Sequence, residues 1–391
     1  MAPLQAPGGQ MRVLVAGAGI GGLTLALALR RRGIGVDVFE RAPDAERVAV
    51  GGGLHLWPNG MRGLREAGVD DRVPGRDDAA AVLRRAEFWN ARSRVLGSFD
   101  VAELERRLGQ PTVGVVRAEL QAMLAAELGD GGVAFGKEVA GVAEDGDGVT
   151  IRFADGDSAR GDVLVGADGV HSTVRRHLHG DDPPRDAGYA AWQALAEPLG
   201  DDTPPGSLRV TFGPGLRVLW YHVGDGRLHW EAIVAGEGRS ADFAALQERV
   251  SDWPSPTAAV LGATTGSPSS MDSYFRPPLR RWGRGRVTLL GDAAHAMTNA
   301  VAQGANMAIE DAAVLAHALS ERPAVAALAD YERRRRARTA QMTRLANGLA
   351  ALARWEHPAA VRVRDALLAR VFFGPIGSRM QARDLDYRFD G

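Results

Sequence analysis

The sequence lacks cysteine altogether, and Lys137 is the single lysine among its 391 residues. Without cysteine there can be no disulfide, thiolate metal site, iron–sulfur cluster, cysteine nucleophile or flavin linked through cysteine. An excess of one charge is also lacking, since 47 basic and 48 acidic residues give a formal net charge of −1. This balance gives no electrostatic reason to expect a nucleic-acid partner or a polybasic membrane-binding protein.

Long uncharged runs are scarce as well. The run at residues 13–29 imitates a signal peptide, but it is short for a membrane span and carries glycines in its middle. A strand, a turn and a helix fit it better, so we expect a cytoplasmic protein with no membrane partner. The 9 histidines show no spacing typical of metal ligands, and we expect no metal site.

A glycine-rich turn between a predicted strand at 11–16 and a predicted helix at 23–32 fits the pattern G-x-G-x-x-G. Gly17 permits the tight turn, Gly19 lets the backbone approach a pyrophosphate, and Gly22 allows close packing of helix on strand. The helix would direct the positive end of its dipole at the phosphates.

An acidic residue follows at the expected distance. Glu40 ends a second predicted strand at 36–40, eighteen residues after the last glycine of the turn. A carboxylate in this position binds a ribose diol and repels a 2′-phosphate, which favours FAD or NAD over NADP. Strand, turn, helix, strand and acid together predict a dinucleotide site.

Two further carboxylates stand where buried strands are predicted to end. Asp168 follows the strand at 162–167, and Asp292 follows the strand at 286–290. Open α/β sheets bind ligands at the carboxyl ends of their strands. Either pattern alone is usually an ordinary turn, but their order and separation indicate one nucleotide-binding half.

The pattern changes between these two carboxylates, where strands with glycine-rich turns are predicted at 208–212, 216–223 and 227–234. The predicted fold class is therefore α/β, with a Rossmann-like nucleotide-binding domain interleaved with an antiparallel-sheet substrate domain and followed by C-terminal helices. The boundaries that we predict are 1–75, 105–177 and 280–345 for the first domain, 76–104 and 178–279 for the sheet domain, and 346–391 for the C-terminal helices.

An arginine run occupies residues 333–336 and 338 on the predicted helices of the C-terminal part. We expect a solvated helix face rather than a nucleic-acid surface. Glu332 and Arg336, one helical turn apart, are expected to form an ion pair.

The three nucleotide-site elements together resemble the single-component, group A flavoprotein monooxygenases, the para-hydroxybenzoate hydroxylase-like family, over nearly the whole chain. The resemblance implies that the glycine turn and Glu40 bind the ADP part of FAD, that Asp168 serves both FAD and NAD(P)H, and that Asp292 holds the ribityl chain. The further cofactor-binding residues that it implies are Arg41, Arg47 (just before the glycines at 51–53), Gly53, Arg117, Gly304 and Ala305.

The activity implied by the resemblance is an FAD-dependent monooxygenase with non-covalent FAD and transiently bound NAD(P)H. A C4a-hydroperoxyflavin formed with O2 would hydroxylate or epoxidise an aromatic, polycyclic or other electron-rich small molecule, in natural-product biosynthesis or aromatic catabolism. Tyr221 is our candidate for orienting a phenol or indole. About half of the sheet aromatics, which include Trp192, Trp220 and Trp230, should be core, because strand neighbours alternate faces. We expect a monomer or homodimer.

Two residues depart from the family pattern. Asn299 stands where the family commonly has a proline, and Ala302 where it has a glycine. Both changes alter the backbone freedom of a loop that would border the flavin. They leave open an FAD-bound cyclase or isomerase that transfers no oxygen. An NAD-dependent dehydrogenase is a more distant alternative, because the elements around Asp168 and Asp292 speak against it.

Overall fold

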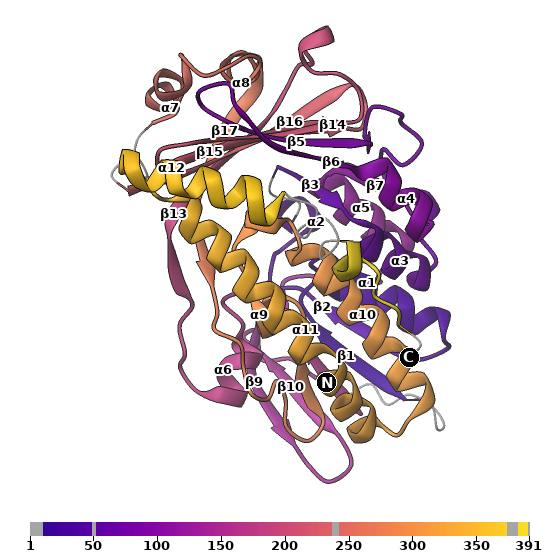
Figure 1. Cartoon of the computed structure of the whole chain (residues 1–391). Coiled ribbons are helices and arrows are strands. Elements are labelled where there is room, and N and C mark those ends of the chain that lie inside the picture. The colour runs from indigo at the N-terminus through magenta and orange to yellow at the C-terminus, as the bar shows by residue number, and fades with distance from the viewer. Residues whose placement is uncertain (1–10, 49–51, 237–241, 374–381, 390–391) are drawn as a thin grey trace.

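The computed structural model describes residues 11–48, 52–236, 242–373 and 382–389 of the chain. A large sheet lies at the top of the view in Figure 1, and a parallel sheet with its helices lies below it. The long helix α11 (Ala324–Ala353) runs beside both parts.

The lower sheet is parallel throughout. Its strand order is β18 (Val287–Leu289), β12 (Val163–Gly166), β1 (Arg12–Ala16), β2 (Gly35–Phe39) and β8 (Val133–Ala134). Helix α1 (Ile20–Arg31) packs on this sheet. Helices α5 (Arg117–Glu127) and α10 (Gly304–Glu321) pack against α1. The central strand is fully buried from Val13 to Val15, which accounts for its unbroken hydrophobic run. The prediction of a Rossmann-like fold is confirmed.

The upper sheet has seven strands. Their order is β17 (Thr264–Phe275), β13 (Arg185–Ala196), β16 (Arg227–Ala235), β15 (Leu216–Val223), β14 (Ser207–Gly213), β5 (Arg85–Asn90) and β6 (Val95–Asp100). The pairings of this sheet are antiparallel except that of β14 with β5, which is parallel and joins strands far apart in the sequence.

The two faces of the upper sheet differ in character. Trp220 and Trp230 lie on the outer face, where they pack with α7 (Phe243–Val250) and α8 (Thr257–Gly262) in a hydrophobic cluster. Tyr221, one residue along the strand, therefore belongs to the inner face, which looks toward the lower sheet.

Shorter elements join the two sheets. One small sheet has the strand order β3 (Gly53–Leu56), β7 (Thr112–Val116) and β4 (Val82–Leu83). A second has the order β11 (Ser158–Gly161), β10 (Val149–Phe153) and β9 (Val139–Glu144). The remaining helices are α2 (Ala45–Val48), α3 (Pro58–Ala67), α4 (Val101–Leu108), α6 (Thr173–His179), α9 (Asp292–His295) and α12 (Pro358–Leu367), with short turns η1 (Asp70–Arg72), η2 (Gly200–Asp202), η4 (Asn299–Val301) and η5 (Leu368–Phe372).

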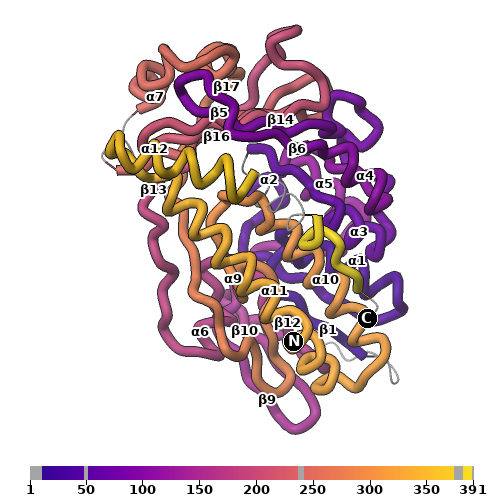
Figure 2. Tube along the Cα trace, in the orientation of Figure 1, coloured from indigo at the N-terminus to yellow at the C-terminus, as the bar shows by residue number. Residues whose placement is uncertain are grey.

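The C-terminal residues return to the nucleotide-binding half. Arg338 donates to the backbone oxygen of Asp384 at 2.6 Å, and Arg62 pairs with Asp386 at 3.0 Å. Figure 2 shows this end segment beside α10 and α11. Helix α11 runs through position 346 without a break, so the boundary that we predicted there falls inside a helix. The division into domains remains a prediction.

The arginine run on α11 is not a uniformly solvated face, and that expectation is wrong. Arg333 is 72% exposed, but Arg335 is fully buried. The expected ion pair is also wrong, because the Glu332 carboxylate accepts from the Trp282 N–H at 3.0 Å and from Thr288. Arg336 donates instead to the backbone oxygen of Glu332.

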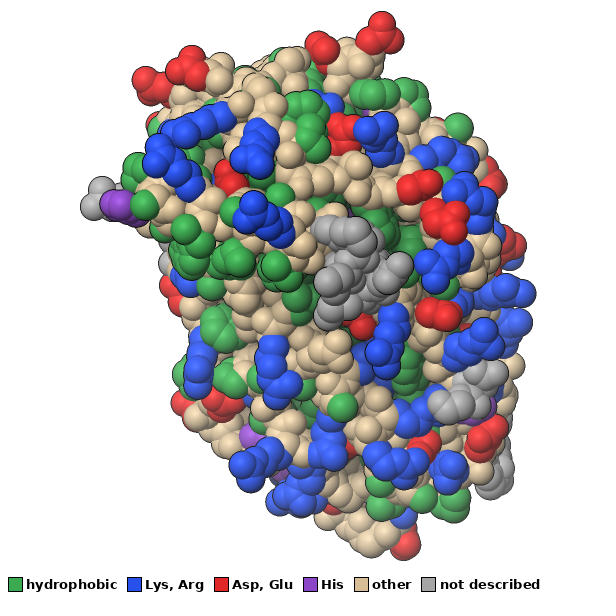
Figure 3. All heavy atoms as spheres, in the orientation of Figure 1, with side chains coloured by type: hydrophobic (Ala, Val, Ile, Leu, Met, Phe, Trp, Pro, Cys, Tyr) green, Lys and Arg blue, Asp and Glu red, His purple; other side chains and the backbone are tan. Residues whose placement is uncertain are grey.

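The surface shown in Figure 3 carries side chains of both charges over most of its area, with hydrophobic ones near α12. Val363, Leu367 and Val371 are the exposed large hydrophobic residues of that region. Among the described residues, none of the helices combines the length and the apolar character that crossing a membrane requires. The described ranges also hold no group of three His, Asp or Glu side chains placed to bind a metal ion.

Candidate active site

A cavity of about 680 Å³ lies between the carboxyl edge of the parallel sheet and the inner face of the upper sheet. Its lining contains every site residue predicted from the sequence, namely Gly17, Gly19, Gly22, Glu40, Arg41, Arg47, Gly53, Arg117, Asp168, Tyr221, Asp292, Gly304 and Ala305. Gly51 lies outside the described residues. Segments far apart in the sequence thus meet at one place, although the role of each residue remains a prediction.

The glycine turn is built as its pattern requires. Gly17 has φ +110°, and a Cβ there would lie 2.4 Å from the carbonyl oxygen of Ala167. A Cβ on Gly22 would lie 2.1 Å from the Gly17 oxygen, whereas one on Gly19 would meet nothing within 4 Å. Helix α1 begins next to Gly19 without a side-chain cap, so the turn leaves open space before a helix N-terminus, as a pyrophosphate requires.

Glu40 is a buried acid that also holds the turn. Its side chain accepts the N–H of Ala18 at 2.8 Å and that of Ala42 at 2.9 Å, and the residue is 9% exposed. Gln121, which sequence reasoning missed, donates to the Ala18 oxygen at 2.7 Å from α5. The turn is therefore fixed from both sides.

Replacing Glu40 by alanine should weaken FAD binding by about 1.5–3 kcal/mol, the loss of one hydrogen bond to a charged group, or about 10–150-fold in Kd. Glu40→Gln keeps the shape and an acceptor oxygen, so it should lose less. Titration of apoprotein with FAD, followed by flavin fluorescence, measures both. An alanine variant that keeps stoichiometric flavin through long dialysis contradicts the assignment.

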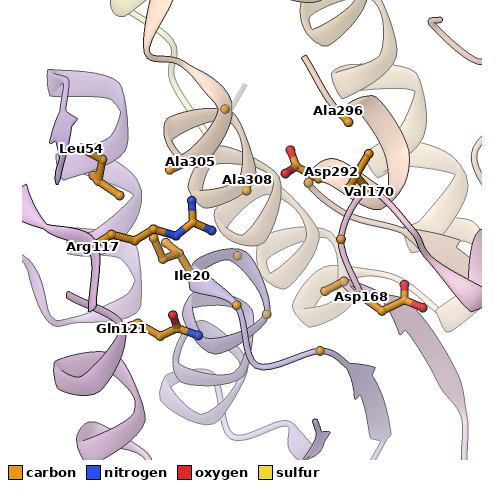
Figure 4. Close-up of a pocket in the computed structure, with 18 of the residues that line it drawn as sticks. Ile20, Leu54, Arg117, Gln121, Asp168, Val170, Asp292, Ala296, Ala305 and Ala308 are labelled. Atoms are coloured by element: carbon orange, nitrogen blue, oxygen red, sulfur yellow. The ribbon is translucent and has the colours of Figure 1, made fainter. Parts of the chain in front are cut away.

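Arg117 and Asp292 have side chains that point into the cavity from opposite sides (Figure 4). Both are exposed there, and neither side chain forms a hydrogen bond or ion pair with another described residue. An unpartnered carboxylate suits the hydroxyls of a sugar chain, and an unpartnered guanidinium suits phosphate or carbonyl oxygens. Together with the open glycine turn, these residues fit FAD.

Asp168 has partners of its own. Its carboxylate accepts from the Ser172 hydroxyl at 2.5 Å and from the Thr173 N–H at 2.7 Å, at the start of α6. Burial raises the pKa of this carboxyl. The neighbouring Gly169 and Val170 also line the cavity. The contact of this segment with FAD and NAD(P)H remains a prediction.

The segment after Asp292 includes the loop that we expected to border the flavin. It contains α9 and the turn η4. The N–H groups of Ala294 and His295 donate to the Gly291 oxygen and so close the single helical turn of α9. Ala302 takes a left-handed conformation with φ 49°, where the family commonly has glycine. Helix α10 begins at Gly304 without a side-chain cap, and its first turn lines the cavity.

A buried network anchors this segment from behind. Asp311 on α10 accepts the N–H of Gly291 at 3.1 Å and bonds to His295 Nε2 at 2.5 Å. Glu310 beside it accepts from Asn59 at 2.7 Å. Asp311 thus holds the Gly291–Asp292 turn, while Glu310 ties α10 to Asn59 of α3.

Tyr221 lies between two imidazoles on the sheet side of the cavity. The ring centroids of His55 and His229 are each 5.1 Å from that of Tyr221. Burial lowers the pKa of His55 to about 4 and that of His229 to about 3, so both rings are neutral near neutral pH. His229 Nδ1 accepts the Gly53 N–H at 2.8 Å, and a Cβ on Gly53 would lie 2.6 Å from that ring.

The polar residues on this side that sequence reasoning missed include His55, His229 and Glu231. The two on β16 have a usable signal, because they lie across from β15 on the face that carries Tyr221. His55 gives no such signal, since it follows a glycine run that shows no strand pattern.

A cavity with a nucleotide-binding wall on one side and a covering sheet on the other defines the class of flavin-dependent oxidoreductases. A family model described as an FAD binding domain matches residues 10–193 and 270–346. The chain belongs to the family of FAD-dependent aromatic monooxygenases of the para-hydroxybenzoate hydroxylase-like type.

Similar proteins match most of the chain. The aurachin C monooxygenase/isomerase of Stigmatella aurantiaca is 34% identical over 383 residues, which cover 96% of this chain and 98% of that protein. The FAD-dependent urate hydroxylase of Klebsiella pneumoniae is 37% identical over 335 residues, covering 83% and 86%. The crystal structure of Klebsiella pneumoniae HpxO complexed with FAD and uric acid matches with a TM-score of 0.85 and 31% identity over 96% of each chain.

These comparisons confirm the predicted family, FAD as cofactor and NAD(P)H as electron donor. The protein is an FAD-dependent monooxygenase, and the dehydrogenase alternative is wrong.

Proposed function

We propose that this protein hydroxylates or epoxidises a small electron-rich aromatic compound bound between the cofactor and the inner face of β15 and β16. One observation carries the proposal: the residues that fit FAD and the sheet residues around Tyr221 line the same cavity. Glu40, Arg117 and Asp292 hold the cofactor in this proposal. The protein acts as a monomer or homodimer.

FAD, when bound, supplies the transfer of electrons from NAD(P)H and of one oxygen atom from O2 to the substrate. The chain supplies position and environment. The upper sheet covers the cavity and excludes water. The N-terminus of α10 at Gly304 favours negative charge in front of it. Burial raises the pKa of Tyr221 well above its usual value, so its neutral hydroxyl is available to orient a polar group.

The names of the relatives indicate which compounds to test first. These names mention aurachin C, urate and 6-hydroxynicotinate. We propose a substrate from this range of ring compounds, with aurachin C as the first to test because the relative named for it matches 96% of this chain.

Labelled oxygen tests the reaction. With NAD(P)H, substrate and ¹⁸O2, we expect NAD(P)H consumption and one labelled oxygen atom in the product, measured by mass spectrometry. Product formed without NAD(P)H and without label would support the cyclase or isomerase alternative that Asn299 and Ala302 left open. The same reaction with labelled water is the control for exchange.

A further inference from the structure

Glu231 is a carboxylate on the substrate side of the cavity that the proposed reaction has not yet used. It lies on β16, its side chain is 14% exposed, and it lines the cavity. Arg217 Nη2 donates to Oε1 at 3.2 Å, and Asn299 Nδ2 donates to Oε2 at 2.6 Å. An ionised carboxylate has about four acceptor positions, so these two bonds leave acceptor capacity toward the cavity.

The positive partner of Glu231 stands behind it. The Arg217 side chain is 5% exposed, does not belong to the lining, and donates also to the Ala300 oxygen at 3.2 Å. Burial raises the pKa of the Glu231 carboxyl, and the charge of Arg217 opposes this rise by favouring the ionised form. A ligand in the cavity therefore meets the carboxylate and not the guanidinium.

The described lining residues of the upper sheet include no cation. His229 is neutral, as is His55 from β3, and Gln193, in register with Glu231, is an uncharged amide. The charged lining residues of this sheet, Glu231 and Asp272, are both acidic. The cations of the lining, Arg41, Arg47, Arg117 and Lys137, come from the nucleotide-binding side.

We propose that Glu231 binds the substrate by accepting a hydrogen bond from a ring O–H or N–H, and that the protein therefore selects neutral hydroxyaromatic or lactam rings over aromatic carboxylates. The carboxylate of a competing compound would face Glu231 without a cation on the sheet to receive it. This inference rests on the proposed function, since it assigns the substrate class of the same cavity.

Asn299 is the positioning residue in this arrangement. Its Nδ2 holds Glu231, while its Oδ1 accepts the hydroxyl of Tyr189 at 2.7 Å. The proline that the family commonly has at this place could make neither bond. In this proposal, Asn299, which stands in place of the family's proline, therefore orients the substrate-binding carboxylate.

Binding to the FAD-loaded protein tests the proposal without turnover. The probes are 4-hydroxyquinoline and quinoline-4-carboxylate, which share a ring system and differ in the group presented. Their affinities are read from the change in flavin absorbance at neutral pH. We expect the wild-type protein to bind the hydroxy compound at least about tenfold more tightly, and Glu231→Gln to reduce that preference about tenfold.

Two further variants separate recognition from folding. Glu87→Gln is the matched control, since Glu87 lies on the same sheet, is 19% exposed and pairs with Arg209 at 3.1 Å outside the cavity lining. It should keep the wild-type preference. Asn299→Pro should keep FAD and reduce the preference about threefold, which a merely structural residue would not do.

Equal binding of the two probes by the wild-type protein, binding of neither, or an unchanged preference in Glu231→Gln would each overturn the assignment. If Glu231→Gln does not fold, the Asn299→Pro result decides, and an unchanged preference there overturns the proposal. The outcome is independent of the labelled-oxygen experiment, which tests the reaction, because probe binding needs neither NAD(P)H nor O2.

Discussion

Asp292→Ala should fold normally and purify largely colourless. The Asp292 side chain is exposed in the cavity and bonds to no other described residue, so its removal takes no interaction from the described protein. If it holds a hydroxyl of the cofactor, its loss costs about 1.5–3 kcal/mol per hydrogen bond, and each bond lost weakens FAD binding about 10–150-fold. The flavin content of purified protein and an FAD titration of apoprotein measure the effect.

The control for this result is Asp252→Ala. Asp252 is also exposed, but it follows α7 on the outer side of the upper sheet and does not line the cavity. It should keep full flavin. The apoproteins of both variants should melt at the wild-type temperature. A yellow, fully active Asp292→Ala protein would refute the role carried over from the family pattern.

The nucleotide-binding wall was predictable because its signals are local. A buried strand, a glycine turn and an acid after the next strand are all written within residues 11–40. Asp168 and Asp292 were found in the same way, since the parallel strands β12 and β18 bring their carboxyl ends to the edge that β1 shares. Backbone constraints of this kind depend little on distant packing.

The substrate wall was not predictable to the same extent. Tyr221 was chosen from the family resemblance, and strand alternation said only that about half of the sheet aromatics belong to the core. The polar character of its neighbours depends on strand pairing across the sheet. His55 and Asn299 reach the cavity from segments far away in sequence, and nothing local indicates that Asn299 bonds to Glu231. Contacts of this range are decided by tertiary structure.

The arginine run shows a second limit. Charge alone predicted a solvated face, but helical spacing places Arg335 with Tyr331 and Thr339, all of them buried. The acids Glu310 and Asp311 lie in a helix that is otherwise alanine-rich and buried, so they need counter-charges. Reading both helices together would have indicated a buried arginine.

Replacing this buried arginine should be among the most destabilising changes in the chain. In the protein, Arg335 donates to Asp311 at 2.6 Å and to Glu310 at 2.5 Å, and all three side chains are fully buried. Arg335→Met fills the space but removes a buried positive charge from both acids. Among the described residues, Asp311 then keeps only His295 and the Gly291 N–H, and Glu310 keeps Arg338 and Asn59. The imbalance of buried charge should cost about 3–5 kcal/mol. For 391 residues, this corresponds to a fall in Tm of about 4–6 °C. Calorimetry or urea unfolding measures it.

Arg333→Met is the matched control, two positions away and 72% exposed, and should change stability by less than about 0.5 kcal/mol.

The pH dependence of stability gives a second check. The pKa of Glu310 and that of Asp311 are lowered mainly by the charges facing them, Arg335 and Arg338 for Glu310, and His295 and Arg335 for Asp311, so the wild-type protein loses their contribution as pH falls through the folded pKa values. Without Arg335, the pKa of Asp311 rises, and protonation relieves the part of its charge that the guanidinium had balanced. The stability difference between Arg335→Met and wild type should therefore shrink as the pH is lowered from neutral toward about 4, the ordinary pKa of a carboxyl group. A difference that stays constant would show that lost packing, and not buried charge, is the cause.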